Sequence, residues 1–181
     1  MDTDVFGQLM GQIDSHTQAG EFEQAYHIAN HLRTGIGDQA IVDGDMYAWS
    51  IYYELRALHA LERWTEYVAQ MNEFFPILFA IGPKNRAYAS SLMMEALAKS
   101  GEASKIPDWG VETCCLRLQS EDFASFKMAL GTTRYLLDSH QQSALFEPFV
   151  RELAARVDDM GLDNLSASLL RIFESKDDDQ P

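Results

Sequence analysis

The sequence predicts an all-α fold: a right-handed array of about four antiparallel helical hairpins with a C-terminal capping helix. Three observations predict it. Apolar residues recur at helical spacing along most of the chain, short stretches often marked by Gly or Pro separate these segments, and a similar apolar pattern returns about every 40 residues. We expect residues 1–175 to form one domain and the acidic residues 176–181 to form a disordered tail.

The repeat is defined by an apolar anchor residue, which recurs at intervals of 42, 42 and 40 residues as Phe22, Trp64, Ile106 and Phe146. Each anchor has a partner three residues later (Ala25, Tyr67, Trp109, Phe149) and an apolar residue nine earlier (Ile13, Leu55, Leu97, Leu137). The slot thirteen residues earlier holds Leu9, Ile51, Met93 and Thr133. These offsets place apolar residues on a helix before each turn and on one after it. A chance alignment of amphipathic helices is the alternative.

In the first half of the chain we expect helices at about 4–19, 21–34, 46–61 and 63–75. Phe6, Leu9 and Ile13 form the apolar stripe of the first. Residues 39–45 are an ambiguous connection, with Asp45 a candidate N-cap. Pro76 should end or kink the fourth helix, and Ile77–Ile81 then reads as a buried extension, with a docking patch as the alternative.

In the second half, Gly82–Asn85 reads as a break, and helices are expected at about 86–99, 103–118, 123–139, 143–160 and 164–175. Pro107 and Pro148 fall near the start of their helices, where proline is tolerated. Gly161 is a C-cap and Asp163 an N-cap for the last helix, which would close the open end of the array.

Composition and charge exclude some partners. The net charge is −14, with 28 acidic and 14 basic residues, which argues against nucleic acid and anionic membranes because both are bound by Lys and Arg. The N-terminus shows no signal peptide, and the longest charge-free apolar run, Phe74 to Ile81, is far short of a membrane span. The adjacent Cys114 and Cys115 read as reduced, buried thiols. We expect a cytoplasmic protein.

No catalytic or cofactor motif is present, so we expect neither an enzyme nor a cofactor. His27 and His31 have the four-residue spacing of two metal ligands on one helix face, but Ile28 stands where the metalloprotease pattern needs Glu. A solvated or partner-facing pair is the favoured interpretation. No basic group is clearly placed to activate Cys114 or Cys115. An enzyme of unrecognised type, in which carboxylates or the histidines converge, stays an alternative.

The first hairpin carries a resemblance to a known family. Gly20-Glu21-Phe22-Glu23-Gln24-Ala25, followed by Ala29, resembles the Gly-x-aromatic-x-x-Ala turn of the tetratricopeptide repeat family. The match covers roughly a sixth of the chain, and Gly101-Glu102-Ala103 echoes it. The resemblance implies a curved array whose inner surface, formed by the first helix of each hairpin, captures a peptide or helix of a partner protein. Another helical-repeat family or an irregular bundle is the alternative.

By this resemblance, the inner positions lie 15, 12, 8 and 5 residues before each anchor. They select Met10, Asp14 and Thr17, then Trp49, Tyr52, Arg56 and His59, then Ser91 and Met94, and finally Arg134 and Asp138. Trp49, Tyr52, Tyr53 and Arg56 also form a second stripe on a helix that is apolar on two faces. Such a stripe is either sandwiched between helices or part of a binding groove, because Trp, Tyr and Arg are enriched at interfaces.

The function expected from these observations is a non-enzymatic protein–protein interaction module. The aromatic cluster around Trp49 would supply the anchors, and Asp14 and Asp138 would contact a basic or amide-rich partner. The prediction fails if Trp49 and Tyr52 are buried between helices. The alternative function is a small-molecule or peptide sensor with an internal pocket. An apolar face around Phe74 to Phe79 would also allow a homodimer.

Overall fold

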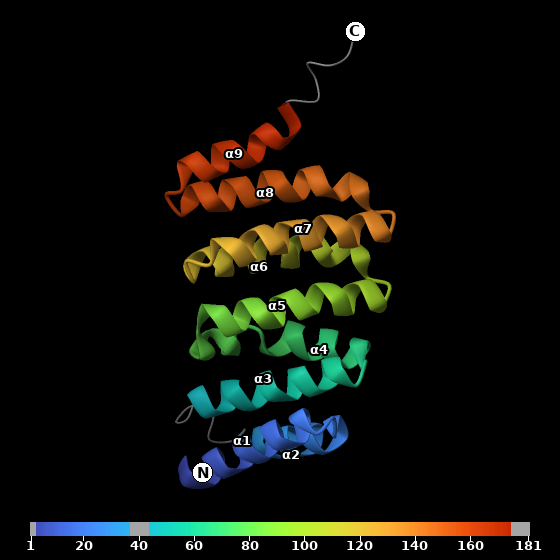
Figure 1. Ribbon diagram of the computed structural model, residues 1–181, viewed down its shortest axis with the longest axis vertical. Coiled ribbons are helices and arrows are strands. Elements are labelled where there is room, and N and C mark those ends of the chain that lie inside the picture. The colour runs from blue at the N-terminus through green and yellow to red at the C-terminus, as the bar shows by residue number, and fades with distance from the viewer. Residues whose placement is uncertain (1–2, 37–43, 175–181) are drawn as a thin grey trace.

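The computed structural model describes residues 3–36 and 44–174, and within them the chain forms nine α-helices, three short 3₁₀ helices and no strand. Consecutive helices lie as stacked rungs from the N-terminal to the C-terminal end (Figure 1). The α-helices are α1 (Thr3–Gln18), α2 (Phe22–Ile36), α3 (Gly44–Ala60), α4 (Trp64–Phe74), α5 (Gly82–Lys99), α6 (Ile106–Gln119), α7 (Phe123–Ser139), α8 (Phe146–Asp159) and α9 (Asp163–Glu174). The 3₁₀ helices are η2 (Ile77–Ile81), η3 (Ala103–Lys105) and η4 (Ser143–Leu145).

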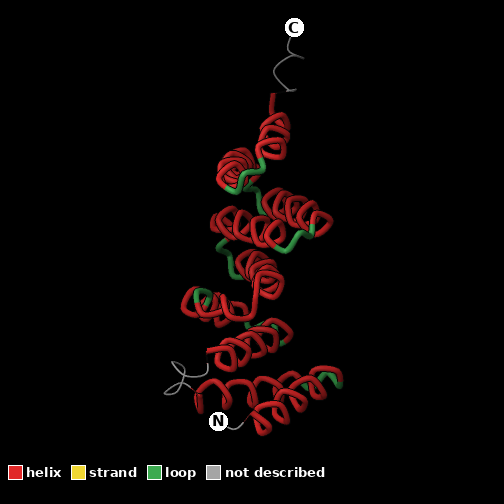
Figure 2. The backbone as a smooth tube through the Cα atoms, turned by 90° about the vertical axis from the view of Figure 1, so that its left-hand side faces the viewer, coloured by secondary structure: helices red, strands yellow, loops and turns green. Residues whose placement is uncertain are grey.

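The four anchor residues each begin a helix: Phe22 opens α2, Trp64 opens α4, Ile106 opens α6 and Phe146 opens α8. The residues nine positions earlier, Ile13, Leu55, Leu97 and Leu137, are all buried on the preceding helices. The helices α1, α3, α5 and α7 contact one another in succession, and α6 contacts α8. In the side view the helices alternate between two layers along the stack (Figure 2).

Several expected boundaries are corrected. α3 begins at Gly44, so Asp45 lies in its first turn, and α5 begins at Gly82 because a helix tolerates Pro83 in its first turn, where an N–H has no helical partner. The predicted helices at 103–118 and 143–160 start as the 3₁₀ turns η3 and η4. Most of the 39–45 connection and the 176–181 tail lie outside the described residues.

The extension after Pro76 is only half buried. It forms η2, whose Leu78 and Ile81 lie in the core, whereas Ile77 is 36% exposed and Phe79 is 77% exposed. The expected buried segment is therefore correct for one face of the 3₁₀ helix and wrong for the other.

Thr133 is the one polar residue among the four that lie thirteen positions before an anchor, and it lies where three helices meet. It is fully buried, and its hydroxyl donates to the carbonyl of Ala129. A Cβ on Gly110 of α6 would lie 2.8 Å from both Cγ2 and Oγ1 of Thr133 and 3.0 Å from the Phe149 ring of α8. The glycine and the small threonine together let α6 approach α7 and α8 closely.

The buried apolar side chains form two clusters. The smaller one fills the first hairpin and reaches α3 through Ala57, and the larger one extends from α3 to α9. Between the first hairpin and the helices that follow it lies the carboxylate of Glu54, which is fully buried. Arg33 of α2 donates to Glu54 Oε2 at 2.5 Å, and Asn30 and Gln70 donate to Oε1 at 2.9 and 2.7 Å. One side chain of α3 thus ties α2 and α4 to it.

The charge of Arg33 is maintained by the same contact. Burial lowers the pKa of its guanidinium, but the hydrogen bond and the charge of Glu54 more than offset this, so the pKa is raised overall. A buried carboxylate with one cation and two amides satisfies most of its acceptor positions, which a buried charge requires.

Six of the connections that the structure describes share one turn geometry. In each, a residue with positive φ follows the helix, and the next N–H donates to a carbonyl five residues earlier, as from Glu21 to His16 and from Gln142 to Leu137, both at 2.8 Å. Glycine suits such a cap because it has no Cβ. The left-handed residues are Gly20, Glu62, Gly101, Glu121, Gln141 and Gly161, so three of these six are not glycine.

We predict that Gln141→Gly stabilises the protein by about 0.5–1 kcal/mol, because a non-glycine residue at φ 58° is strained and the gain is reduced by the entropy of glycine in the unfolded chain. Urea unfolding measures it. The matched control is Gln142→Gly at the next position, where φ is −110° and glycine should destabilise. Equal effects of the two substitutions would contradict the strain argument.

We further predict that Glu54→Gln costs about 2–4 kcal/mol of unfolding free energy, because it keeps the shape but leaves the Arg33 cation without its carboxylate. Glu147→Gln, which breaks the exposed pair with Arg151, is the control and should cost about 0.5 kcal/mol or less. Denaturant unfolding of both variants measures the two losses of unfolding free energy. A cost for Glu54→Gln as small as that of the control would show that the buried contact contributes little.

Candidate binding groove

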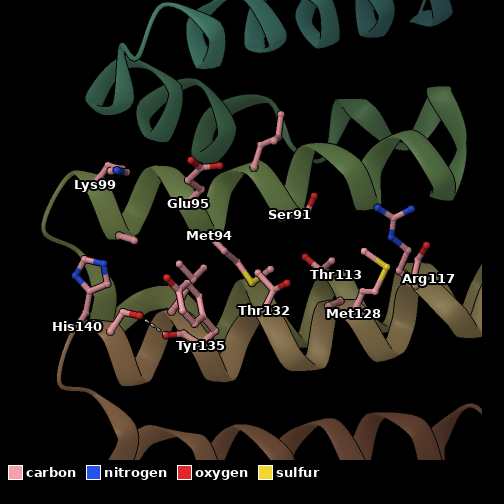
Figure 3. A pocket seen from close by; sticks show the side chains of 16 residues that line it. Ser91, Met94, Glu95, Lys99, Thr113, Arg117, Met128, Thr132, Tyr135 and His140 are labelled. Carbon is pink, nitrogen blue, oxygen red and sulfur yellow. Dashed lines mark hydrogen bonds between the residues drawn. The ribbon is translucent and has the colours of Figure 1, made fainter.

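A groove of about 560 Å³ lies between α5 and α7, with α6 beneath it (Figure 3). We call it the α5–α7 groove. Its lining combines apolar and polar side chains from the three helices: Ser91, Leu92, Met94, Glu95, Ala98 and Lys99 of α5, Thr113 and Arg117 of α6, and Ser125, Met128, Ala129, Thr132, Tyr135, Leu136, Ser139 and His140 at or after α7. A volume of this size is in the range of ligand-binding clefts.

The apolar part of the groove includes two large side chains that are exposed to solvent, Met128 and Tyr135. Met128 is 71% exposed and Tyr135 is 69% exposed, and the two lie one after the other along α7 (Figure 3). Buried Met94 and Thr113 form the floor. Lys99 and His140 lie at one end of the groove, and Arg117 lies toward the other (Figure 3).

The amphipathic pattern of α7 explains this exposure. Phe126, Ala129, Thr133 and Leu137 are buried at helical spacing and attach α7 to the stack. The helix is fixed at its start by Asp122, whose side chain accepts a 3.0 Å hydrogen bond from the Ser125 N–H as an N-cap. Met128 and Tyr135 are seven residues apart, and two turns of helix place them on one stripe that the core does not use.

The predicted aromatic cluster on α3 is partly core. Tyr52 is only 7% exposed, so the expectation that its ring contacts a partner is corrected: most of the ring packs inside the larger apolar cluster. Trp49 is half-buried against it, with ring centroids 5.6 Å from Tyr52 and 6.0 Å from Tyr53. Arg56 stacks 5.4 Å from the Tyr53 ring.

Other predicted positions join neighbouring helices. Asp14 of α1 accepts a long 3.5 Å contact from the Tyr53 hydroxyl, and His59 of α3 lies 3.1 Å from Glu95 of α5. Met10 is half-buried, and the Thr17 hydroxyl donates back to the Ile13 carbonyl of its own helix. Neighbouring first helices therefore contact each other through several of the predicted side chains, which are engaged within the protein.

In the third and fourth hairpins the predicted register is shifted. Met94 is fully buried with its sulfur 3.4 Å from the Thr133 hydroxyl oxygen, and Arg134 and Asp138 pair with each other at 3.8 Å outside the groove lining. The cause is that η3 and η4 insert three residues between the left-handed turn residue and the anchor, which the first two hairpins lack.

The left-handed residue lies two positions before the anchor in the first two hairpins, so the equivalent offsets counted back from it are 13, 10, 6 and 3 residues. Ten and six residues before Gly101 are Ser91 and Glu95, and thirteen and six residues before Gln141 are Met128 and Tyr135, all of which line the groove. Sequence reasoning missed Met128 and Tyr135 because a 3₁₀ turn leaves no distinct sequence signal ahead of an apolar anchor.

The histidines and cysteines considered as metal ligands or reactive groups lie outside the α5–α7 groove. His27 and His31 are exposed on α2, and among residues 3–36 and 44–174 no group of three His, Cys, Asp or Glu side chains could hold a metal ion. Both cysteines are buried free thiols, and burial raises the pKa of Cys115 to about 11 and that of Cys114 still further. None of the helices in the described part is long and apolar enough to cross a membrane.

No family model matches this chain, and neither a curated protein nor a solved structure shows significant similarity to it.

Proposed function

We propose that the protein is an interaction module that binds a segment of a partner protein in the α5–α7 groove. The observation that carries this proposal is the pair of large exposed side chains, Met128 and Tyr135, beside a floor formed by buried Met94 and Thr113. Met and Tyr are enriched at protein interfaces, because they offer large contact area, and Tyr also offers a polar hydroxyl.

The groove favours an amphipathic segment with acidic flanks. Leu92, Ala129 and Leu136 offer apolar contact along the middle, where a helix or strand of the partner would bury two or three apolar side chains. Lys99 lies near one end and Arg117 near the other, and Glu95 is already occupied by His59. Charge complementarity therefore favours acidic residues on both sides of the apolar centre.

We also propose that the hairpins form a tetratricopeptide-repeat-like array in which the first helices make the binding surface. The succession of contacts from α1 to α3, α5 and α7 and the Gly20-Glu21-Phe22 turn support this arrangement. Because Met128 and Tyr135 are exposed, the groove is open to solvent, which supports a surface that binds a partner segment over a pocket that encloses a ligand.

A display selection of random peptides on the full chain, followed by fluorescence polarisation, tests the proposal. We expect selected peptides to lose at least tenfold in affinity on the Met128→Ala/Tyr135→Ala variant, because truncating two central anchors costs about 1 kcal/mol or more each. The matched control is Phe79→Ala, which removes another exposed aromatic ring outside the groove and should leave binding unchanged.

Circular dichroism first establishes that both variants are folded. Selected peptides that bind the double variant as well as wild type, or that depend on Phe79 instead, would place the interaction elsewhere and refute the groove. A selection that yields no binder at all would also count against the proposal.

A further inference from the structure

A second hollow, of about 320 Å³, adjoins the α5–α7 groove. It is lined by Tyr52 and Arg56 of α3, Lys84, Asn85 and Tyr88 of α5, and Arg117 of α6, and Arg117 lines both hollows. We call it the basic hollow. Its three cations come from three different helices of a chain with only 14 basic residues and a net charge of −14. The hollow is therefore locally positive, whereas the protein as a whole is negatively charged.

The side chains of the basic hollow face one another. The Arg56 guanidinium lies 5.9 Å from the centre of the Tyr52 ring, and the rings of Tyr52 and Tyr88 are 6.4 Å apart. Burial raises the pKa of the Tyr52 hydroxyl, and the positive charges of Arg56 and Arg117 act on it in the opposite direction. The hydroxyl therefore stays protonated and able to donate at neutral pH.

The positive charge of the hollow is not neutralised within the described part of the chain. Arg117 lies 3.9 Å from Asp122, whose pKa is lowered by its hydrogen bonds with Ser125 and, more weakly, by the charges of Arg117 and Lys84. Arg56 and Lys84 make no ion pair with any described residue, whereas Arg33, Arg63 and Arg86 each have a carboxylate partner. The lining of the hollow thus contains three cations and no carboxylate, which leaves an excess of positive charge.

This excess matches a dianion with several acceptor oxygens better than a carboxylate. A single carboxylate is satisfied by one arginine, whereas a phosphoryl monoester carries nearly two negative charges and three acceptors. The hollow offers two guanidiniums, one ammonium and the hydroxyls of Tyr52 and Tyr88. The acidic residues elsewhere are screened beyond about 8 Å at physiological ionic strength, so the local cluster decides which ion is bound.

We propose that the basic hollow binds the phosphoryl group of a phosphorylated side chain in the segment that occupies the α5–α7 groove. The inference rests on the proposed function, because Arg117 connects the two hollows and a segment lying in the groove would reach the basic hollow at that end. Phosphorylation of the partner would then control its capture.

The first test uses peptide libraries with a fixed central phosphoserine, phosphothreonine or phosphotyrosine, beside the same libraries without phosphate. We expect the phosphorylated form of a selected peptide to bind the full chain at least tenfold more tightly than the unphosphorylated form. Arg56→Gln/Lys84→Gln should reduce this preference to less than twofold. The matched control, Lys127→Gln/Arg171→Gln, removes two exposed positive charges outside both hollows and should retain it.

The second test separates the basic hollow from the groove. Phenyl phosphate and benzoate are titrated separately into isotope-labelled protein and followed by NMR. We expect phenyl phosphate to shift the amides around Tyr52, Lys84 and Arg117, and benzoate to bind at least fivefold more weakly. Arg56→Gln/Lys84→Gln should abolish the shifts, with its fold verified by the unchanged spectrum of the remaining helices.

Each of the remaining outcomes would overturn a different claim. Peptides that bind in the groove regardless of phosphate would overturn this inference and leave the proposed function standing. Phenyl phosphate binding in the basic hollow without capture of any peptide would overturn the phosphorylated segment and favour a free phosphorylated metabolite. Equal binding of benzoate and phenyl phosphate would overturn the preference for a dianion.

Discussion

The buried carboxylate of Glu54 is the contact on which the N-terminal half of the stack depends. It draws a donor from α2 through Arg33 and another from α4 through Gln70, while its own helix, α3, packs against both. An apolar side chain at this point would let the hairpins slide past each other at small cost. A charge with fixed donors permits one register, which is the best-attested use of buried polar groups. The placement of α3 then sets where α5 and the grooves beyond it lie.

The helices that form the binding surface also supply side chains to the core. Tyr52 shows both in one side chain, since most of it is buried in the core and it also lines the basic hollow together with Arg56 and Arg117. Further along, α5 gives Met94 to the core and Ser91 and Glu95 to the groove. A helix with core contacts on several sides can place polar groups accurately, because its rotation is fixed by the packing and not by the ligand.

Sequence patterning anticipated the elements better than the site. The anchors Phe22, Trp64, Ile106 and Phe146 predicted helix starts because apolar periodicity is a local signal. The site residues were counted back from the anchors, and the three-residue insertions η3 and η4 between turn and anchor shifted that count without a distinct sequence signal. Glu54 was hidden for another reason: its partners Arg33 and Gln70 are 21 and 16 residues away, and no local rule joins them. The same holds for Arg56, Lys84 and Arg117.

The ordering of the helices in the stack also bears on how the chain reaches this structure. Each helix packs mainly on elements that are close to it in sequence, and the N- and C-terminal helices lie at opposite ends (Figure 1). Few distant segments have to find each other, so loop closure costs little entropy and folding should be rapid for a chain of this length. A nascent chain can therefore begin to assemble hairpin by hairpin before the last helices have been synthesised.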